Sequence, residues 1–225
     1  MSAADPTAPA GSVAVCGGGL IGTSLALALR AAGVVDVRVA DRSAEVRASV
    51  SARDAGLVVT GSWVEAAAAA DVVVAAVPPS AVPDVLSEAV VVAAPDAVLT
   101  DVAGVKAAVG AAVAAALGPA AARYVGGHPM AGSERSGPDA ADATLFSGAT
   151  WVLTPTEGTA DAALRRAGDL VRLVGARALV LDPEGHDAVV ALVSHLPQLV
   201  ASVLADVAAD AVGPERDAVL AVAGP

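Results

Sequence analysis

The chain has 225 residues, which is long for one domain and short for two full domains. Its formal net charge of −11 argues against nucleic acid as a partner, because phosphate binding requires a basic face. Although 56% of the residues are hydrophobic, charged residues and prolines interrupt the apolar stretches before about 18 residues accumulate, so no membrane span is expected.

The single cysteine, Cys16, excludes an internal disulfide framework and favours a reducing, cytoplasmic environment. It lies within an apolar run, so we expect a small core residue rather than a nucleophile. The three histidines are scattered without zinc-ligand spacing, and no metal is expected. Residues 1–11 lack the basic start and apolar core of a signal peptide and are interpreted as a disordered tail.

Apolar runs at strand spacing and at helix spacing alternate along most of the chain. Strands are expected at Ser12–Cys16, Val35–Ala40, Leu57–Thr60, Asp71–Val77, Ala97–Asp101, Arg123–Gly126, Ala149–Thr154 and Arg177–Leu181. Helices are expected at Leu20–Ala32, Ser43–Ala55, Trp63–Ala70, Ala81–Ala93, Ala103–Leu117 and Asp161–Val174. The alternation predicts an α/β, doubly wound Rossmann-type domain over residues 12–182. One long apolar helix, Pro183–Ala211, then begins an all-α dimerisation domain over residues 183–225.

Gly17, Gly19 and Gly22 match the pattern G-x-G-x-x-G between the first strand and the first helix. In a dinucleotide site the first glycine makes the turn, the second admits the pyrophosphate, and the third lets the helix pack closely. Asp41 ends the second strand, where it would accept hydrogen bonds from the ribose hydroxyls and repel a 2′-phosphate. We therefore expect NAD, with NADP less favoured, although Arg42 leaves NADP open. The alternative is a merely structural turn.

The segment Gly126–Gly137, GGHPMAGSERSG, gathers glycines and polar side chains around one histidine, His128. The histidine is expected just past the end of a strand, at the edge of the sheet where ligands bind in parallel α/β folds. Small residues there let the backbone approach a ligand, while neighbouring polar groups supply donors and acceptors. The alternative is a flexible surface loop with an incidental histidine.

Six segments occur in one order: GGGLIGTSLALAL, AVPPS, DVAGVKA, GGHPMAGSERSG, TWVLTP and HDAVVALVSHLPQ. Together they resemble the prephenate/arogenate dehydrogenase family of tyrosine biosynthesis. The resemblance implies NAD-dependent oxidative decarboxylation of prephenate to 4-hydroxyphenylpyruvate, or of arogenate to tyrosine. It also implies a homodimer formed through the C-terminal helices. The cofactor-binding residues expected from the fingerprint and the resemblance are Gly17, Gly19, Leu20, Ile21, Gly22, Asp41, Arg42, Val77, Pro78 and Asp101.

The resemblance also implies roles for residues near the substrate. His128 would accept the proton of the 4-hydroxyl group, a task that suits imidazole near neutral pH. Ser133 and Glu134 would line the substrate pocket. His195 and Gln198, three residues apart, would share a helix face that closes over the substrate.

Each of these roles has a structural alternative. His195, two residues before Pro197, could only satisfy a backbone carbonyl at a kink. His186 is interpreted as structural, a cap or a packing contact near the start of the long helix. Asp101 and Lys106 could cap and solvate a helix, although the family places this turn at the nicotinamide end of the cofactor.

The sequence departs from the family pattern in ways that leave two rival functions open. The family usually carries serine at Gly104, and many members have a second histidine at Gln198, which leaves prephenate and arogenate equally open. The family also continues beyond residue 225 with an arginine that binds a substrate carboxylate, so a truncated form is expected. The rivals are a β-hydroxyacid dehydrogenase, which would need a lysine on the long helix, and a cofactor-binding remnant without turnover.

Overall fold

The computed structural model describes residues 11–212, with side chains up to residue 208. The predicted tail, residues 1–11, therefore lies almost wholly outside the described residues, as does the end of the predicted helical domain, residues 213–225. The described chain divides into two compact units, the first ending at His186 and the second beginning at Asp187.

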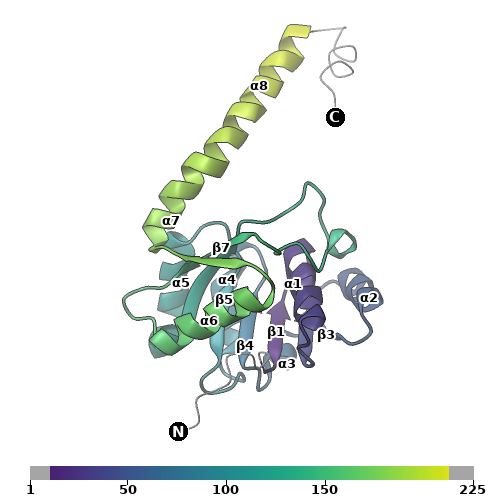
Figure 1. Cartoon of the computed structure of the whole chain (residues 1–225), viewed down its shortest axis with the longest axis vertical. Coiled ribbons are helices and arrows are strands. Elements are labelled where there is room, and N and C mark those ends of the chain that lie inside the picture. The colour runs from purple at the N-terminus through teal and green to yellow at the C-terminus, as the bar shows by residue number, and fades with distance from the viewer. Residues whose placement is uncertain (1–10, 213–225) are drawn as a thin grey trace. The chain divides into compact units, whose positions relative to one another are not determined.

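The strands of the first unit form one eight-stranded sheet in the order β3-β2-β1-β4-β5-β6-β7-β8 (Figure 1). Strands β1 to β6 are parallel and have the strand order of dinucleotide-binding folds. This arrangement confirms the predicted α/β Rossmann-type class. The strands are β1 Val13–Cys16, β2 Val37–Ala40, β3 Val58–Thr60, β4 Val72–Ala75, β5 Val98–Asp101, β6 Tyr124–Pro129, β7 Thr150–Thr154 and β8 Arg177–Val180.

Helices cover both faces of the sheet, because the parallel strands are apolar on both sides. Alternate residues of β1 face opposite layers: Val13 and Val15 pack with α1, α2 and α6, whereas Ala14 and Cys16 pack with α3, α4 and α5. The helices are α1 Leu20–Ala31, α2 Ala44–Arg53, α3 Trp63–Ala67, α4 Val82–Ala89, α5 Ala107–Leu117 and α6 Asp161–Leu173. Short 3₁₀ turns are η1 Pro79–Ala81, η2 Gly118–Arg123 and η3 Pro138–Ala140.

Strand β6 extends three residues further than predicted, so His128 lies within the strand and not past its end. The reason is β7, which runs antiparallel to β6 and pairs Gly126 with Thr154 and His128 with Val152. A Cβ on Gly126 would overlap Thr154 Oγ1, and one on Gly127 would overlap the Asp101 carbonyl oxygen. The two glycines therefore serve close packing within the sheet, and the predicted loop position of His128 is wrong.

Helix α5 begins four residues later than predicted, at Ala107 and not at Ala103. The Asp101 carboxylate accepts a hydrogen bond from the Ala103 backbone N–H at 2.7 Å, which holds residues 101–103 in a turn. This turn precedes the helix and, as shown below, forms part of a cavity wall.

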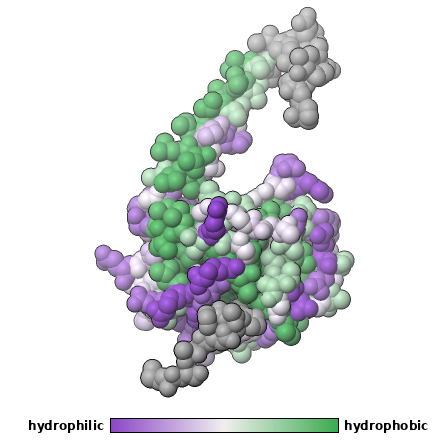
Figure 2. Space-filling model, in the orientation of Figure 1, coloured by the Kyte–Doolittle hydropathy of each residue, from purple (hydrophilic) through white to green (hydrophobic). Residues whose placement is uncertain are grey.

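The second unit contains the end of α7 (Pro183–Val190), a π-helical turn η4 (Ala191–His195) and α8 (Leu196–Val212). The predicted single helix is thus interrupted by a π turn, which directly precedes Leu196-Pro197. A proline cannot donate to the carbonyl four residues earlier, and such sites favour altered helical turns. Exposed apolar side chains lie along the described part of α8, from Leu196 to Val207, and this part appears mostly green in Figure 2. By length and composition alone, Pro183–Ala208 is apolar enough to cross a bilayer, with a mean hydropathy of 1.9.

Candidate active site

The glycine turn between β1 and α1 has the geometry expected of a dinucleotide fingerprint. Gly17 has φ +118°, and a Cβ there would overlap the Ala76 carbonyl oxygen. A Cβ on Gly22 would overlap the Gly17 carbonyl oxygen, so only glycine lets α1 pack against the turn. Nothing lies within 4 Å of a Cβ on Gly19, which leaves that side of the turn open.

No side chain of the described residues caps the N-terminus of α1. Gly19 is the N-cap, and the first turn of the helix carries no acidic residue. The backbone N–H groups and the positive end of the helix dipole therefore favour binding of an anion such as a pyrophosphate. The residues present fit a dinucleotide.

Asp41 follows β2 and contacts the same turn. Its Oδ2 accepts a hydrogen bond from the Gly18 N–H at 2.8 Å, and its Oδ1 accepts one from the Ser43 N–H at 2.9 Å. The carboxylate thereby supports the turn, while its contact with a ribose stays a prediction. The adjacent Arg42 guanidinium lies 5.5 Å from the ring centroid of Trp63, within reach of a cation–π interaction.

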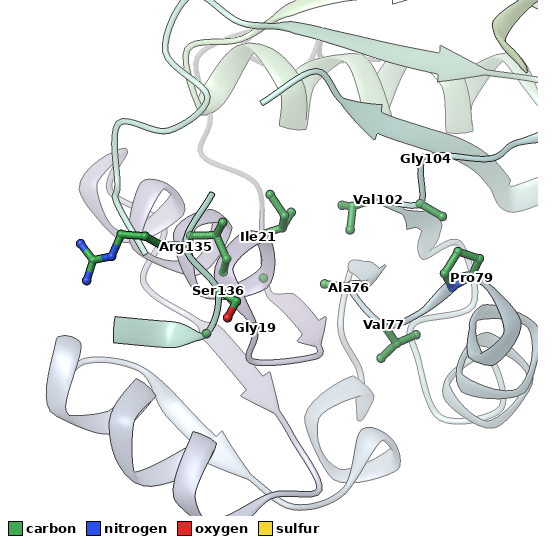
Figure 3. A pocket seen from close by; sticks show the side chains of 13 residues that line it. Gly19, Ile21, Ala76, Val77, Pro79, Val102, Gly104, Arg135 and Ser136 are labelled. Atoms are coloured by element: carbon green, nitrogen blue, oxygen red, sulfur yellow. The ribbon is translucent and has the colours of Figure 1, made fainter. Parts of the chain in front are cut away.

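A cavity of about 490 Å³ opens at the carboxyl ends of the central strands (Figure 3). Of the predicted cofactor residues, Gly19, Leu20, Ile21, Gly22 and Val77 line it. The other predicted residues are not in its wall, and their cofactor contacts stay predictions: Gly17, Asp41, Arg42, Pro78 and Asp101. The remaining wall residues are Ala76, Pro79, Val102, Ala103, Gly104, Arg135, Ser136 and Gly137.

A buried polar network lies behind the wall formed by residues 102–104. The Lys106 ammonium forms an ion pair with the Asp101 carboxylate and donates to the Gly127 carbonyl oxygen at 2.6 Å. The Tyr124 hydroxyl donates to Asp101 Oδ2 at 2.5 Å, and burial followed by the Asp101 charge raises the pKa of this phenol. Lys106 is 1% exposed, so the interpretation of a solvated lysine is wrong. The network joins β5 to β6 next to His128.

The imidazole of His128 lies beside the cavity wall. A Cβ added at Gly104 would lie 3.5 Å from His128 Nε2, so this nitrogen faces the glycine that lines the cavity. On the other side of the ring, His128 Nδ1 lies 2.8 Å from Nε2 of His186. His186 is completely buried, at the start of α7.

The predicted substrate residues of the loop after β6 are exposed. Ser133 Oγ donates to Glu134 Oε2 at 3.2 Å and accepts from the Arg135 N–H at 3.2 Å. Arg135, Ser136 and Gly137 reach the cavity, and the Arg135 guanidinium points away from its centre in Figure 3. No described contact joins Ser133 or Glu134 to His128, and their substrate roles stay predictions.

His195 and Gln198 belong to the second unit. His195 is the last residue of the π turn, and Gln198 lies in the first turn of α8. Both side chains are exposed. Their predicted role in closing the substrate site stays a prediction.

Cys16 ends β1 directly before the glycine turn and is completely buried. Burial, with a smaller contribution from Glu88, raises the pKa of its thiol to about 12. The thiol is therefore protonated at neutral pH, which agrees with the expected core residue and excludes a thiolate nucleophile.

Comparison with known families identifies both units. Residues 25–180 match the nucleotide-binding domain of prephenate dehydrogenase, and residues 182–224 match the dimerisation domain of the same enzyme. The chain belongs to the prephenate dehydrogenase family. The first match begins after Gly22, so the geometry of the glycine turn is additional evidence for nucleotide binding.

Three similar proteins illustrate the relationship. A probable prephenate dehydrogenase of Streptomyces niveus is 41% identical over 191 residues, which are 85% of this chain and 51% of that protein. A cyclohexadienyl dehydrogenase of Zymomonas mobilis is 35% identical over 192 residues, 84% of this chain and 64% of that protein. The crystal structure of the Aquifex aeolicus prephenate dehydrogenase, in complex with hydroxyphenyl propionate and NAD+, has a TM-score of 0.82 at 29% identity. The match covers 91% of this chain and 71% of that one.

The chain spans less than two thirds of the length of these two curated relatives. Within that span, the sequence pattern missed two features of the site. The first is the partner of His186: the sequence predicts a cap or a packing contact for this residue but does not indicate that His128 is what it contacts. The second is the approach of residues 135–137 to the glycine turn, which depends on the path of the loop after β6. In the sequence, the segment HDAVVALVSHLPQ was the only indication that His186 could belong to the site.

Proposed function

We propose that this chain carries the NAD-binding and proton-accepting parts of a dehydrogenase that oxidatively decarboxylates prephenate or arogenate. The observation that carries the proposal is the position of His128, whose Nε2 faces Gly104 at the wall of the nucleotide cavity. A base at that wall is next to the place where a cofactor and a substrate ring would meet. Membership of the prephenate dehydrogenase family supplies the substrate class.

The chemistry assigns a clear task to the protein. Bound NAD would supply the acceptor for the hydride of the ring carbon bearing the 4-hydroxyl group, and carbon dioxide would leave the opposite ring carbon. His128 Nε2 takes the hydroxyl proton as the C–O bond becomes a carbonyl. The ring then becomes aromatic as the carboxylate leaves, and the phenolate oxygen formed takes the proton back from the His128 imidazolium. Ile21, Val77 and Val102 form an apolar part of the wall, which would keep water from the hydride path once cofactor and substrate are bound. The products are 4-hydroxyphenylpyruvate or tyrosine, carbon dioxide and NADH.

The acid at Asp41 supports a preference for NAD over NADP, because a carboxylate at the end of β2 repels a ribose 2′-phosphate. Its two hydrogen bonds to the backbone fix its position next to the turn. The uncapped N-terminus of α1 supplies the pyrophosphate site.

We propose further that the protein is a cytoplasmic homodimer. The family assigns residues 182–224 to dimerisation, and α8 exposes a stripe of apolar side chains that must be covered. A second copy would cover it, with well over 1,000 Å² of total surface buried, as in a stable interface. The low cysteine content, with Cys16 as the one cysteine of the sequence, is typical of proteins of a reducing compartment.

The rival β-hydroxyacid dehydrogenase finds less support. That chemistry needs a lysine as an acid on the long helix, whereas the one lysine of the sequence, Lys106, is buried in an ion pair with Asp101. The other rival, a cofactor-binding remnant that has lost its activity, is distinguished from an active dehydrogenase by the following experiment.

The deciding experiment follows NADH formation by absorbance after NAD is mixed with prephenate or with arogenate. We expect turnover with one or both substrates, and none with 3-hydroxyisobutyrate. Calorimetric binding of NAD to the same protein provides the control. NAD binding without turnover on either substrate would identify the remnant, and absence of NAD binding would refute the cofactor site itself.

A further inference from the structure

We infer that His186 is a positioning residue for His128, holding its imidazole in the tautomer whose Nε2 is unprotonated and faces Gly104 at the cavity wall. The inference rests on the proposed function, in which His128 Nε2 is the base. The family match and the fingerprint assign no such task to His186.

The contact between the two rings is close and enclosed. His128 Nδ1 and His186 Nε2 are 2.8 Å apart, a normal hydrogen-bond distance. The ring centroids are 5.1 Å apart and the planes meet at 69°, so the rings meet edge-on and not stacked. Complete burial of His186 keeps water from replacing it as the partner.

The fold fixes His186 through the strands that follow His128. Strand β7 pairs with β6, and β8 pairs with β7, so the chain that leaves β8 begins α7 near His128. Asp182 then starts the helix: its Oδ1 accepts from the Gly185 N–H at 2.7 Å, and its carbonyl oxygen accepts from the His186 N–H at 2.9 Å. The backbone of His186 is therefore held by its own helix turn, independently of the imidazole contact.

Only one of two arrangements of the shared proton suits a base. If His186 Nε2 carries the proton and donates it to His128 Nδ1, then neutral His128 is protonated on Nε2 and cannot accept another proton there. If His128 Nδ1 carries the proton and donates to His186 Nε2, then His128 Nε2 carries no proton and can accept one. In the second case the imidazolium formed during the reaction keeps an acceptor for its Nδ1–H, and the charge strengthens that bond. A carboxylate has the same orienting task in serine hydrolases.

The test compares His186→Gln, whose side-chain amide oxygen can accept from His128 Nδ1–H, with His186→Leu, which cannot. The sequence has three histidines, so ¹⁵N-histidine NMR resolves each ring, and His128→Asn assigns the signal of His128. We expect His128 to be protonated on Nδ1 in the unmodified protein and in the glutamine variant. In the leucine variant we expect a shift towards the Nε2–H form. Nε2–H on His128 in the unmodified protein, or an unchanged tautomer in the leucine variant, would overturn the inference.

Kinetics provides a second and separate measurement. We expect kcat of the leucine variant to fall by about 10-fold to 100-fold, the usual loss for an orienting partner, with KM for NAD unchanged. The glutamine variant should recover most of the loss, which a purely structural role would not predict. If the leucine variant does not fold, the NMR spectra of the unmodified protein and of the glutamine variant still show which nitrogen of His128 is protonated, and so test the inference. If no substrate turns over, the proposed function is refuted, whereas the NMR spectra still report the tautomer of His128.

Discussion

His128 lies beside the cavity wall on a hydrogen-bonded strand, in register with Val152 of β7. Its replacement by asparagine keeps a polar side chain in the strand but removes the base. We expect kcat to fall by about 10²–10⁴, the usual contribution of general-base catalysis, with the Kd for NAD nearly unchanged. Steady-state kinetics at saturating NAD and calorimetric binding measure the two quantities. Near-full kcat in this variant would show that the histidine is only structural.

Asp41 is expected to set the choice between NAD and NADP. In Asp41→Asn the charge that repels a 2′-phosphate is lost, while one oxygen remains to accept a hydrogen bond from the Gly18 N–H. The difference in binding free energy between NADH and NADPH should narrow by about 1–2 kcal/mol, the scale of a charge-assisted hydrogen bond. Calorimetric titration with both cofactors measures it. Glu157→Gln, an equal change of charge in an exposed loop, is the control, and equal cofactor affinities in the unmodified protein would refute the assignment.

The residues that could be predicted from sequence are those whose requirements are local. Gly17, Gly19 and Gly22 all belong to one turn, and their spacing in the sequence was sufficient to predict that turn. The partner of His128 could not be predicted in the same way. His186 lies 58 residues further along the chain, and two intervening strands must pair before the rings meet.

At the scale of elements, strand positions followed from apolar periodicity, but the extent of β6 did not. Two adjacent glycines are poor strand formers, so a predicted strand that ended at Gly126 was the local expectation. The actual strand depends on β7, which begins only at Thr150 and arrives antiparallel. The local sequence pattern does not indicate which distant segments will pair, and for this reason His128 was expected in a loop.

The close approach of β6 to β5 predicts that a larger side chain at Gly127 lowers the stability of the protein. A Cβ in Gly127→Ala would overlap the Asp101 carbonyl oxygen, a backbone atom that cannot rotate away. We expect the free energy of unfolding to fall by about 1–3 kcal/mol, the usual cost of overpacking. Gly132→Ala is the control, because nothing lies within 4 Å of its Cβ, and it should change stability by less than about 0.5 kcal/mol. Urea denaturation compares the two, and equal stabilities would contradict the close-packing explanation.

At the scale of the whole molecule, the change from alternating strands and helices to one apolar helix predicted a second body near residue 183. The described chain divides at His186, and the family matches divide between residues 180 and 182. The π turn at Ala191–His195 could not be predicted, because Pro197 indicates a disturbed helix without specifying which turn absorbs the disturbance.

The apolar stripe of α8 provides the test of the dimer. Its members recur at helical spacing and are all exposed: Leu196, Leu199, Val200, Val203, Leu204 and Val207. We expect the unmodified protein to sediment as a dimer at micromolar concentration and Leu204→Glu to sediment as a monomer, because a buried unpaired charge is costly.

Ser202→Glu is the matched control for the dimer. Ser202 lies off the apolar stripe, four residues after Gln198 and four before Asp206, and should leave the dimer intact. A monodisperse monomer of the unmodified protein would exclude the dimer, and dissociation by both variants would show that the stripe is not its specific surface.

The thiol of Cys16, the one cysteine of the sequence, can be used to measure how often the nucleotide-binding unit opens transiently. Because the thiol is buried at the end of the central strand and has a pKa of about 12, an alkylating reagent should modify it only when the sheet separates. Its labelling rate without denaturant therefore measures how often the nucleotide-binding unit opens. Saturating NAD binds only the closed form and should slow labelling in proportion to ligand concentration over Kd. Rapid labelling of the native protein, unaffected by NAD, would contradict both the burial of Cys16 and its coupling to the cofactor site.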